Sequence, residues 1–254
     1  MRGKLACIIL PLYNEAASFS LLREMFDSGL EITPEIDYLI IVVDDGSTDI
    51  TPCLAWQWAI ENAAVIVLTH PENRGLGAAL MTGFRAAVAL GADYLVTLDG
   101  DATHPAAKIG ELLAAVSGEA DIAIASRFTK TSRTAGVPLY RRFCSIGASF
   151  VFQCVFPLRG VRDYTTGFRA YRAAVVREML ARHPTPVFRS FAVSVEILLY
   201  SAAFAGLITE VPLVLRYDLK RSPSKMNVLS TVRDCLRLCL LPKATCKLGR
   251  GLRG

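Results

Sequence analysis

Short apolar segments alternate with segments of helical periodicity through the first half of the chain. Continuous apolar runs of this kind are typical of strands that are covered by helices on both faces, as in a parallel sheet. The alternation therefore predicts an α/β fold with an open, mostly parallel sheet flanked by helices. The predicted strands are 5–10, 38–43, 64–69, 94–98 and 122–125, and the predicted helices are 14–26, 49–62, 76–90 and 105–116.

The second half of the chain has a less regular pattern. The sequence shows no internal repeat and no linker, so we expect one domain at 1–225, followed by a basic amphipathic helix and tail at 226–254. The elements predicted here are helices 139–156, 173–182, 191–204 and 228–241, a strand at 208–215, a polar loop at 162–169 and a basic loop at 220–225.

The composition excludes several classes of protein. The chain is 52% hydrophobic and 20% charged, which is unlike a disordered or fibrous protein. No segment has the length and purity expected of a helix that spans a membrane. The seven cysteines contain no Cys-x-x-Cys pair, which indicates reduced thiols and a cytosolic setting.

Positive charge is concentrated at the C-terminal end. Residues 216–254 carry a net charge of +8, whereas residues 1–215 carry −3. This asymmetry suggests an anionic partner for the tail, and charge alone leaves membrane phospholipid, a lipid phosphate and nucleic acid open. A tail that is merely solvated is an equally good interpretation.

An acidic turn, Asp99-Gly100-Asp101, follows directly after the predicted strand 94–98. Residues two apart in an extended chain point the same way, so the two carboxylates repel each other unless a cation lies between them. Hard oxygen ligands of this kind suit Mg²⁺ or Mn²⁺ and leave positions open for substrate phosphates. Thr103 is placed to add a further oxygen, and His104 is expected to support the turn without binding the metal.

Other polar motifs follow the neighbouring predicted strands, at the edge where α/β sheets bind their ligands. Tyr13 and Glu15 follow the first strand, and Asp45 follows the second. An acceptor at Asp45 suits the N–H edge of a nucleobase or a ribose hydroxyl. Gly75 and Gly77 resemble part of a dinucleotide fingerprint, but its third glycine is missing, which argues against a dehydrogenase.

Cationic and hydroxyl side chains complete the candidate site. Arg127 follows the strand 122–125 and is expected to meet a phosphate, and Asp163 begins a polar loop that is suited to an acceptor. Arg221 and Lys225 lie in the basic loop and are expected to close over a diphosphate.

Taken together, these motifs resemble family 2 glycosyltransferases of the GT-A (Rossmann-like) fold, most closely the dolichol-phosphate mannose synthase group of polyprenyl-phosphate glycosyltransferases. The resemblance covers about residues 5 to 225. The matching segments, in the order of the family, are 11–15, 44–51, 73–77, 99–105, 126–128, 165–169, 210–212 and 224–225.

The resemblance implies a role for each matched residue. Asp99 and Asp101 are expected to bind Mg²⁺ or Mn²⁺ on the donor diphosphate, and Thr103 stands where some members carry a Gln ligand. Gly100, in the same turn, is expected to contact the nucleotide-sugar. The basic loop is one residue longer than the family spacing. The residues expected to hold the nucleoside are Pro11, Tyr13, Glu15, Val43 and Asp45, and those expected to contact phosphates are Arg127, Arg221 and Lys225.

The implied reaction is an inverting, metal-dependent transfer of a sugar from a GDP-mannose or UDP-hexose type donor to a polyprenyl or dolichyl phosphate. Asp101, Arg127 and Asp163 are the expected catalytic residues. An ionised lipid phosphate needs no strong general base, whereas a hydroxyl acceptor requires one, for which Asp163 and Glu196 are the candidates.

Two other functions stay open. The first is a family 2 glycosyltransferase that acts on a soluble or natural-product hydroxyl. The second is a catalytically silent protein that binds nucleotide-sugars or docks to a membrane. For the leading interpretation we expect a cytoplasmic protein that contacts the membrane through helix 228–241 and binds no nucleic acid, although this helix is equally suited to packing on the core.

Overall fold

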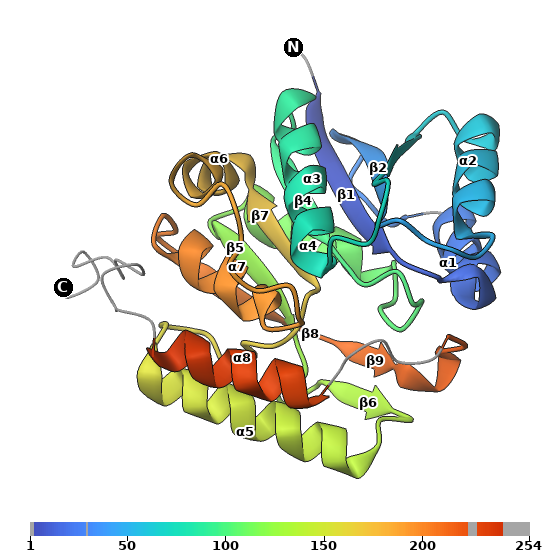
Figure 1. Cartoon of the computed structure of the whole chain (residues 1–254). Coiled ribbons are helices and arrows are strands. Elements are labelled where there is room, and N and C mark those ends of the chain that lie inside the picture. The colour runs from blue at the N-terminus through green and yellow to red at the C-terminus, as the bar shows by residue number, and fades with distance from the viewer. Residues whose placement is uncertain (1–2, 29, 223–227, 241–254) are drawn as a thin grey trace.

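The computed structural model describes residues 3–28, 30–222 and 228–240, and it has the predicted α/β architecture (Figure 1). A seven-stranded sheet in the order β3-β2-β1-β4-β7-β5-β8 forms its centre. Every neighbouring pair in this sheet is parallel except those of β7, which runs antiparallel to β4 and β5. The strands are β1 (Lys4–Leu12), β2 (Ile36–Asp44), β3 (Val65–Thr69), β4 (Tyr94–Thr97), β5 (Ile122–Ser126), β7 (Arg169–Arg172) and β8 (Ile208–Pro212).

Helices cover both faces of the sheet, which explains the continuous apolar strands. Alternate residues of a strand point to opposite faces. In β1, Ile8 and Leu10 belong to a core shared with α1 (Ala16–Asp27), α2 (Thr51–Glu61) and α4 (Lys108–Ser117). Cys7 and Ile9 belong to a second core, which contains residues of α3 (Leu76–Ala89), α6 (Ala173–Arg182) and α7 (Val193–Ala202).

Strand β7 was not predicted, and part of it was assigned to the loop 162–169. Its four residues, Arg-Ala-Tyr-Arg, have charged ends and do not form an apolar run. Because β7 is antiparallel, its first residue lies at the edge where its neighbours end, and Arg169 pairs with Thr97 at the end of β4. The loop 163–168 before β7 is therefore brought to the carboxyl edge of the sheet.

The predicted strand 208–215 is two strands. β8 ends at Pro212, and β9 (Val214–Arg216) pairs with β6 (Arg133–Ala135) in a separate two-stranded parallel sheet. The short helix η1 (Tyr217–Leu219) follows β9. Helices α1 and α4 also begin two to three residues later than predicted, at Ala16 and Lys108.

Two amphipathic helices lie side by side below the sheet, as Figure 1 shows. They are α5 (Leu139–Val155) and α8 (Val228–Leu240), close to the predicted bounds. Leu238 of α8 is fully buried in the core. In the described part of the chain, every helix is too short or too polar to cross a membrane. Lys225 and the tail at 241–254 lie outside the described residues, so the division at 225/226 stays a prediction.

Candidate active site

The acidic turn lies at the carboxyl end of β4, as predicted, and packs tightly against the end of β1. A Cβ atom added to Gly100 would lie 2.2 Å from Leu12 Cδ2 and 2.8 Å from the carbonyl oxygen of Pro11. Only glycine allows this approach without a shift of the neighbouring atoms. The close packing places both carboxylates of the turn beside β1, where the predicted nucleoside residues begin.

Asp101 is held by residues from two distant parts of the chain. Its Oδ1 accepts hydrogen bonds from the Thr103 hydroxyl at 2.7 Å and the Thr103 amide at 3.2 Å. Its Oδ2 forms an ion pair with Nζ of Lys220. Burial opposes ionisation of Asp101, but Lys220 and the other favourable contacts outweigh it and lower the pKa of this carboxyl.

Asp99 is supported by His104 but has a different electrostatic environment. The Asp99 amide donates to His104 Nδ1 at 3.2 Å, and the imidazole stacks on Phe168 with ring centroids 5.1 Å apart. Burial raises the pKa of the Asp99 carboxyl; His104 opposes this effect, and the nearby charge of Asp101 adds to it. The turn thus contains two carboxylates whose mutual repulsion an additional cation would relieve.

These residues fit a hard divalent cation. Asp99 and Asp101 offer carboxylate oxygens, and the ion pair with Lys220 shows that the turn attracts positive charge. Within the described residues, no group of three or more His, Cys, Asp or Glu side chains forms a closed metal site. The remaining ligands of Mg²⁺ or Mn²⁺ would therefore come from water, from substrate phosphate oxygens or from Thr103. The role of Thr103 as a ligand stays a prediction.

Asp45 is buried at the end of β2 and organises the loop before α3. Its Oδ1 accepts from the Arg74 amide at 3.0 Å and lies 2.7 Å from His70 Nδ1. Its Oδ2 accepts from the Gly75 amide at 2.7 Å. Both oxygens of Asp45 therefore already have partners within the protein, and Oδ2 retains the capacity to accept one more hydrogen bond. Contact of Asp45 with a nucleoside stays a prediction.

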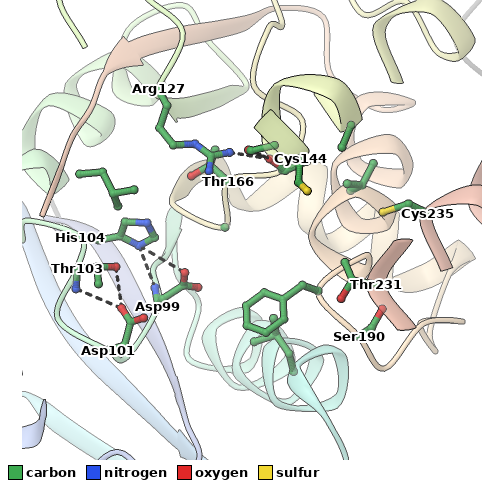
Figure 2. A pocket seen from close by; sticks show the side chains of 18 of the residues that line it. Asp99, Asp101, Thr103, His104, Arg127, Cys144, Thr166, Ser190, Thr231 and Cys235 are labelled. Carbon is green, nitrogen blue, oxygen red and sulfur yellow. Dashed lines mark hydrogen bonds and ion pairs between the residues drawn. The ribbon is translucent and has the colours of Figure 1, made fainter. Parts of the chain in front are cut away.

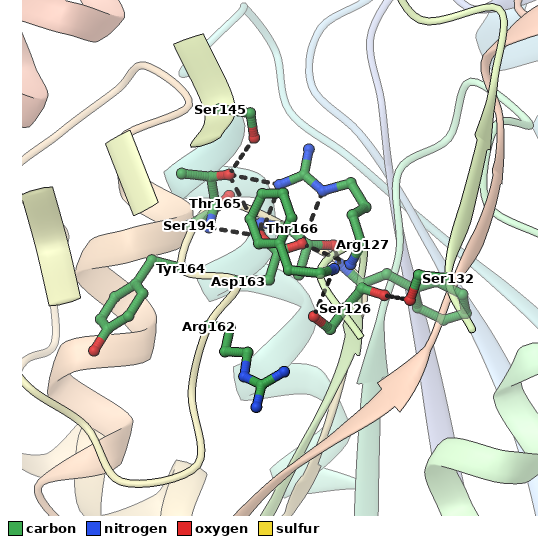
Figure 3. Close-up of polar contacts among 12 residues, drawn as sticks. Ser126, Arg127, Ser132, Ser145, Arg162, Asp163, Tyr164, Thr165, Thr166 and Ser194 are labelled. Atoms are coloured by element: carbon green, nitrogen blue, oxygen red, sulfur yellow. Dashed lines mark hydrogen bonds and ion pairs between the residues drawn. The ribbon is translucent and has the colours of Figure 1, made fainter. Parts of the chain in front are cut away.

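Arg127 and Asp163, chosen separately from the sequence, form a bidentate ion pair (Figure 3). Arg127 Nε and Nη2 donate to Asp163 Oδ2 and Oδ1 at 2.8 and 2.7 Å. Arg127 Nη2 also donates to the Thr165 hydroxyl at 2.6 Å, which lies 3.0 Å from Ser145 Oγ of α5. Burial opposes the charge on Asp163, but Arg127 outweighs it and lowers the pKa of the carboxyl.

This pairing bears on how Asp163 can act. Its side chain is fully buried, and it also accepts hydrogen bonds from the amides of Thr165 and Thr166. A carboxylate that is enclosed in this way positions Arg127 and has no free path to a substrate hydroxyl. Glu196, the other candidate base, accepts from the amides of Val187 and Phe188 and is likewise fully buried.

A cavity of about 1100 Å³ connects these groups. In Figure 2, the acidic turn and His104 lie at one end of it, Arg127, Thr166 and Cys144 of α5 along one side, and Cys235 of α8 toward the other end. Residues of the sequence-based site that line the cavity are Pro11, Tyr13, Glu15, Asp45, Asp99, Gly100, Asp101, Thr103 and Arg127.

Three predicted site residues do not line the cavity, and a fourth lies outside the described residues. Val43 is fully buried in the core, and Asp163 lies behind Arg127. Arg221 is exposed and does not line the cavity, and Lys225 lies outside the described residues. Sequence reasoning assigned no role to Lys220, since its contact with Asp101 joins residues 119 positions apart and leaves no local signal.

Comparison with known proteins identifies the family. Residues 7–180 match the model of Glycosyl transferase family 2, which is well over half of the chain. The chain belongs to glycosyl transferase family 2. The sequence-based resemblance to this family is therefore confirmed.

Two curated relatives show what this family 2 chain is similar to. It is 35% identical over 173 residues to a dolichol-phosphate mannosyltransferase of Pyrococcus furiosus, covering 66% of this chain and 46% of the relative. It is 32% identical over 173 residues to a polyprenol monophosphomannose synthase of Mycolicibacterium smegmatis, covering 68% of this chain and 63% of the relative. The match thus spans between about half and two thirds of these relatives' own length.

A solved structure supports the fold of this family 2 chain. Glucosyl-3-phosphoglycerate synthase from Mycobacterium tuberculosis, in complex with Mn²⁺, uridine-diphosphate-glucose and phosphoglyceric acid, superposes with a TM-score of 0.69. The alignment covers 98% of this chain and 82% of that one, at 19% identity. At this identity the likeness shows the fold alone, which is the predicted GT-A fold.

Proposed function

We propose that the protein transfers a sugar from a nucleotide-sugar to a polyprenyl phosphate at a membrane surface, in a metal-dependent reaction that inverts the anomeric carbon. The observation that carries this proposal is the single cavity that runs from the acidic turn to α5 and α8. One end offers carboxylates for a metal-bound diphosphate, and the part lined by α5 and α8 includes apolar side chains such as Ile146, Val151 and Leu236. A ligand with a charged head and an apolar chain fits such a shape.

The similar proteins support the lipid acceptor. The two relatives described above are named for mannosyl transfer to dolichol phosphate and for synthesis of a polyprenol monophosphomannose. A third, from Micrococcus luteus, is an undecaprenyl-phosphate mannosyltransferase. A relative from Methanococcus voltae is named as a UDP-N-acetylglucosamine–dolichyl-phosphate N-acetylglucosaminyltransferase, so the donors to be tested include both GDP- and UDP-sugars.

The donor would lie along the ends of β1, β2 and β4. Asp99 and Asp101 would hold Mg²⁺ or Mn²⁺, which when bound supplies charge neutralisation for the leaving diphosphate. Tyr13 and Glu15 also line the cavity and would contact the nucleoside. Gly100 packs against Pro11 and Leu12, so the acidic turn lies close to the segment that carries Tyr13 and Glu15.

The acceptor would approach from the side of Arg127. This guanidinium is held by Asp163 and stays partly accessible, with 19% of its side chain exposed. A phosphate monoester bound there is already ionised near neutral pH and attacks the anomeric carbon without a general base. The buried, engaged carboxylates of Asp163 and Glu196 therefore favour a phosphate acceptor over the alternative hydroxyl acceptor.

The surface of α5 and α8 supports contact with a membrane. Large apolar side chains on α5 are exposed at helical spacing, and α8 carries further exposed apolar side chains. Arg233 and Arg237 of α8 are more than 60% exposed and would meet anionic headgroups. Of the predicted stripe of α8, Val232, Leu236 and Leu240 are exposed, and the first two of these also line the cavity. The exposed apolar residues are Leu139, Phe143, Ile146, Phe150, Val232, Leu236 and Leu240.

The transfer reaction is tested with a panel of GDP- and UDP-sugars, each with Mn²⁺ or Mg²⁺, with and without a polyprenyl phosphate. We expect one donor to give a lipid-linked sugar in a reaction that stops when EDTA removes the metal. Equal transfer to a soluble hydroxyl acceptor in the absence of lipid phosphate would instead support the alternative glycosyltransferase. Donor binding without turnover on any acceptor would indicate a silent binding protein.

Membrane contact is tested by sedimentation with vesicles that contain anionic phospholipid. The double variant Phe143→Ser, Phe150→Ser is expected to bind vesicles at least about tenfold more weakly, because it removes two large apolar side chains from α5. The matched control is Trp56→Ser, Ile60→Ser on α2, which removes an exposed apolar pair from another part of the surface. Equal loss in both variants would contradict a specific role for α5.

A further inference from the structure

A short segment, which we call the strap (residues 216–222), lies across the acidic turn and is fixed at both ends. At its start, the Arg216 amide donates to the carbonyl oxygen of Thr103 at 3.0 Å. At its end, Ser222 is buried, and its hydroxyl donates to Glu15 and lies 2.8 Å from Ser18 Oγ. These anchors hold the middle of the strap over the donor end of the cavity.

Lys220 is the residue that the strap presents to the acidic turn. Its ammonium forms an ion pair with Asp101 Oδ2, and the two side chains are only 12% and 15% exposed. The other oxygen of Asp101 is engaged by Thr103. Lys220 therefore covers the Asp101 oxygen that is best placed to bind an external cation.

An ammonium group and a divalent cation cannot share this oxygen. Two positive charges at contact distance repel each other, and the repulsion is twice as large when one of them is a divalent ion. Metal binding through Asp101 Oδ2 thus requires Nζ of Lys220 to leave. A nucleoside diphosphate on the same turn would give the departing ammonium a new anionic partner.

We propose that Lys220 is a displaceable cation which makes metal binding depend on the nucleotide diphosphate. Without nucleotide, the metal competes with Lys220 for Asp101; with nucleotide, Lys220 transfers to the phosphates and the competition ends. This coupling is reciprocal, so metal and nucleotide each strengthen the binding of the other. The inference rests on the proposed metal-dependent function and assigns a role to a residue which that function left unused.

The test is a titration of the metal-free protein with Mn²⁺, followed by paramagnetic resonance of the free ion, first alone and then with GDP or UDP. Lys220→Met is expected to bind Mn²⁺ alone about tenfold more tightly than the unchanged protein. With the diphosphate present, the higher Mn²⁺ affinity of Lys220→Met is expected to disappear, because this variant lacks the ammonium group that would bind the phosphates. Lys220→Gln should behave in the same way.

Arg221→Met is the matched control, because it removes the same charge from the adjacent residue of the strap, whose side chain is exposed. It should change binding of Mn²⁺ alone much less than Lys220→Met. Hydrogen exchange of residues 217–222 gives a second readout: Mn²⁺ with diphosphate should alter it in the unchanged protein and not in Lys220→Met. Equal or weaker binding of Mn²⁺ alone by Lys220→Met would overturn the inference. Failure of every variant to bind Mn²⁺, even with diphosphate, would overturn the proposed metal-dependent function as well.

Discussion

Asp101→Asn is expected to lower kcat for sugar transfer by roughly 10³-fold, the range seen when a preorganised electrostatic group is removed from an active site. The amide keeps the shape of the side chain and still accepts a hydrogen bond from Thr103, but it loses the charge that would hold the metal. It also loses its ion pair with Lys220. The measurement is transfer with the donor identified by the panel, together with Mn²⁺ binding.

The matched control is Asp27→Asn, which makes the same chemical change at an exposed ion pair with Arg23 on α1. It should leave both kcat and Mn²⁺ binding unchanged. Retention of transfer and of Mn²⁺ binding in Asp101→Asn would contradict the assignment of the acidic turn as the metal site. Loss of transfer with normal Mn²⁺ binding would show that Asp101 acts in another way.

Asp163→Ala is expected to destabilise the protein by about 3–5 kcal/mol, because it leaves the largely buried Arg127 without its charge partner. Activity should fall as well, since Arg127 would no longer be held toward the cavity. Urea denaturation gives the stability change, and transfer to the lipid phosphate gives the activity change.

The stability effect of Asp163 also depends on pH in a defined direction. The native pKa of Asp163 is lowered, so its contribution is complete above the unfolded pKa of about 4 and is lost as the pH falls through the native value. The gap in stability between the unchanged protein and Asp163→Ala should therefore be constant near neutral pH and narrow in acid. A gap that widens in acid would contradict the ion pair.

A second comparison separates positioning from base catalysis. Arg127→Met alone should lose as much activity as Arg127→Met, Asp163→Leu, because the two residues act as a unit. The double variant should also recover stability relative to Asp163→Ala, since it buries no unpaired charge. If Asp163 were a general base, the second substitution would cause a further loss of activity on top of Arg127→Met.

The sequence predicted the parallel core of the sheet because each of its strands is buried on both faces and is therefore a continuous apolar run. The same reasoning could not find β7, whose ends are Arg169 and Arg172. Arg169 is fully buried, and it is accommodated by the carbonyl oxygens of Ser194 and Tyr164. Those partners are set by the tertiary structure and leave no local pattern.

The candidate site also contains residues that the sequence indicates and contacts that only the tertiary structure shows. Asp99, Asp101 and Asp45 were found because they follow apolar strands, and parallel strands end at one edge. The sequence indicates Arg127 and Asp163 separately but not their pairing over 36 positions, which is why Asp163 is a candidate base for a hydroxyl acceptor at that stage. In the sequence, Lys220 is one of several positive charges in a basic loop. Its position beside Asp101 depends on tertiary contacts on either side of it, made by β9 and by Ser222.

The antiparallel strand β7 has a mechanical consequence. It is hydrogen-bonded to β4, at the donor end of the cavity, and to β5, which leads to Arg127, so these two parts belong to one uninterrupted sheet. A hinge that opens and closes two lobes about the bound substrates would have to break those ladders. We therefore expect substrates to enter and leave without relative movement of these two parts of the sheet.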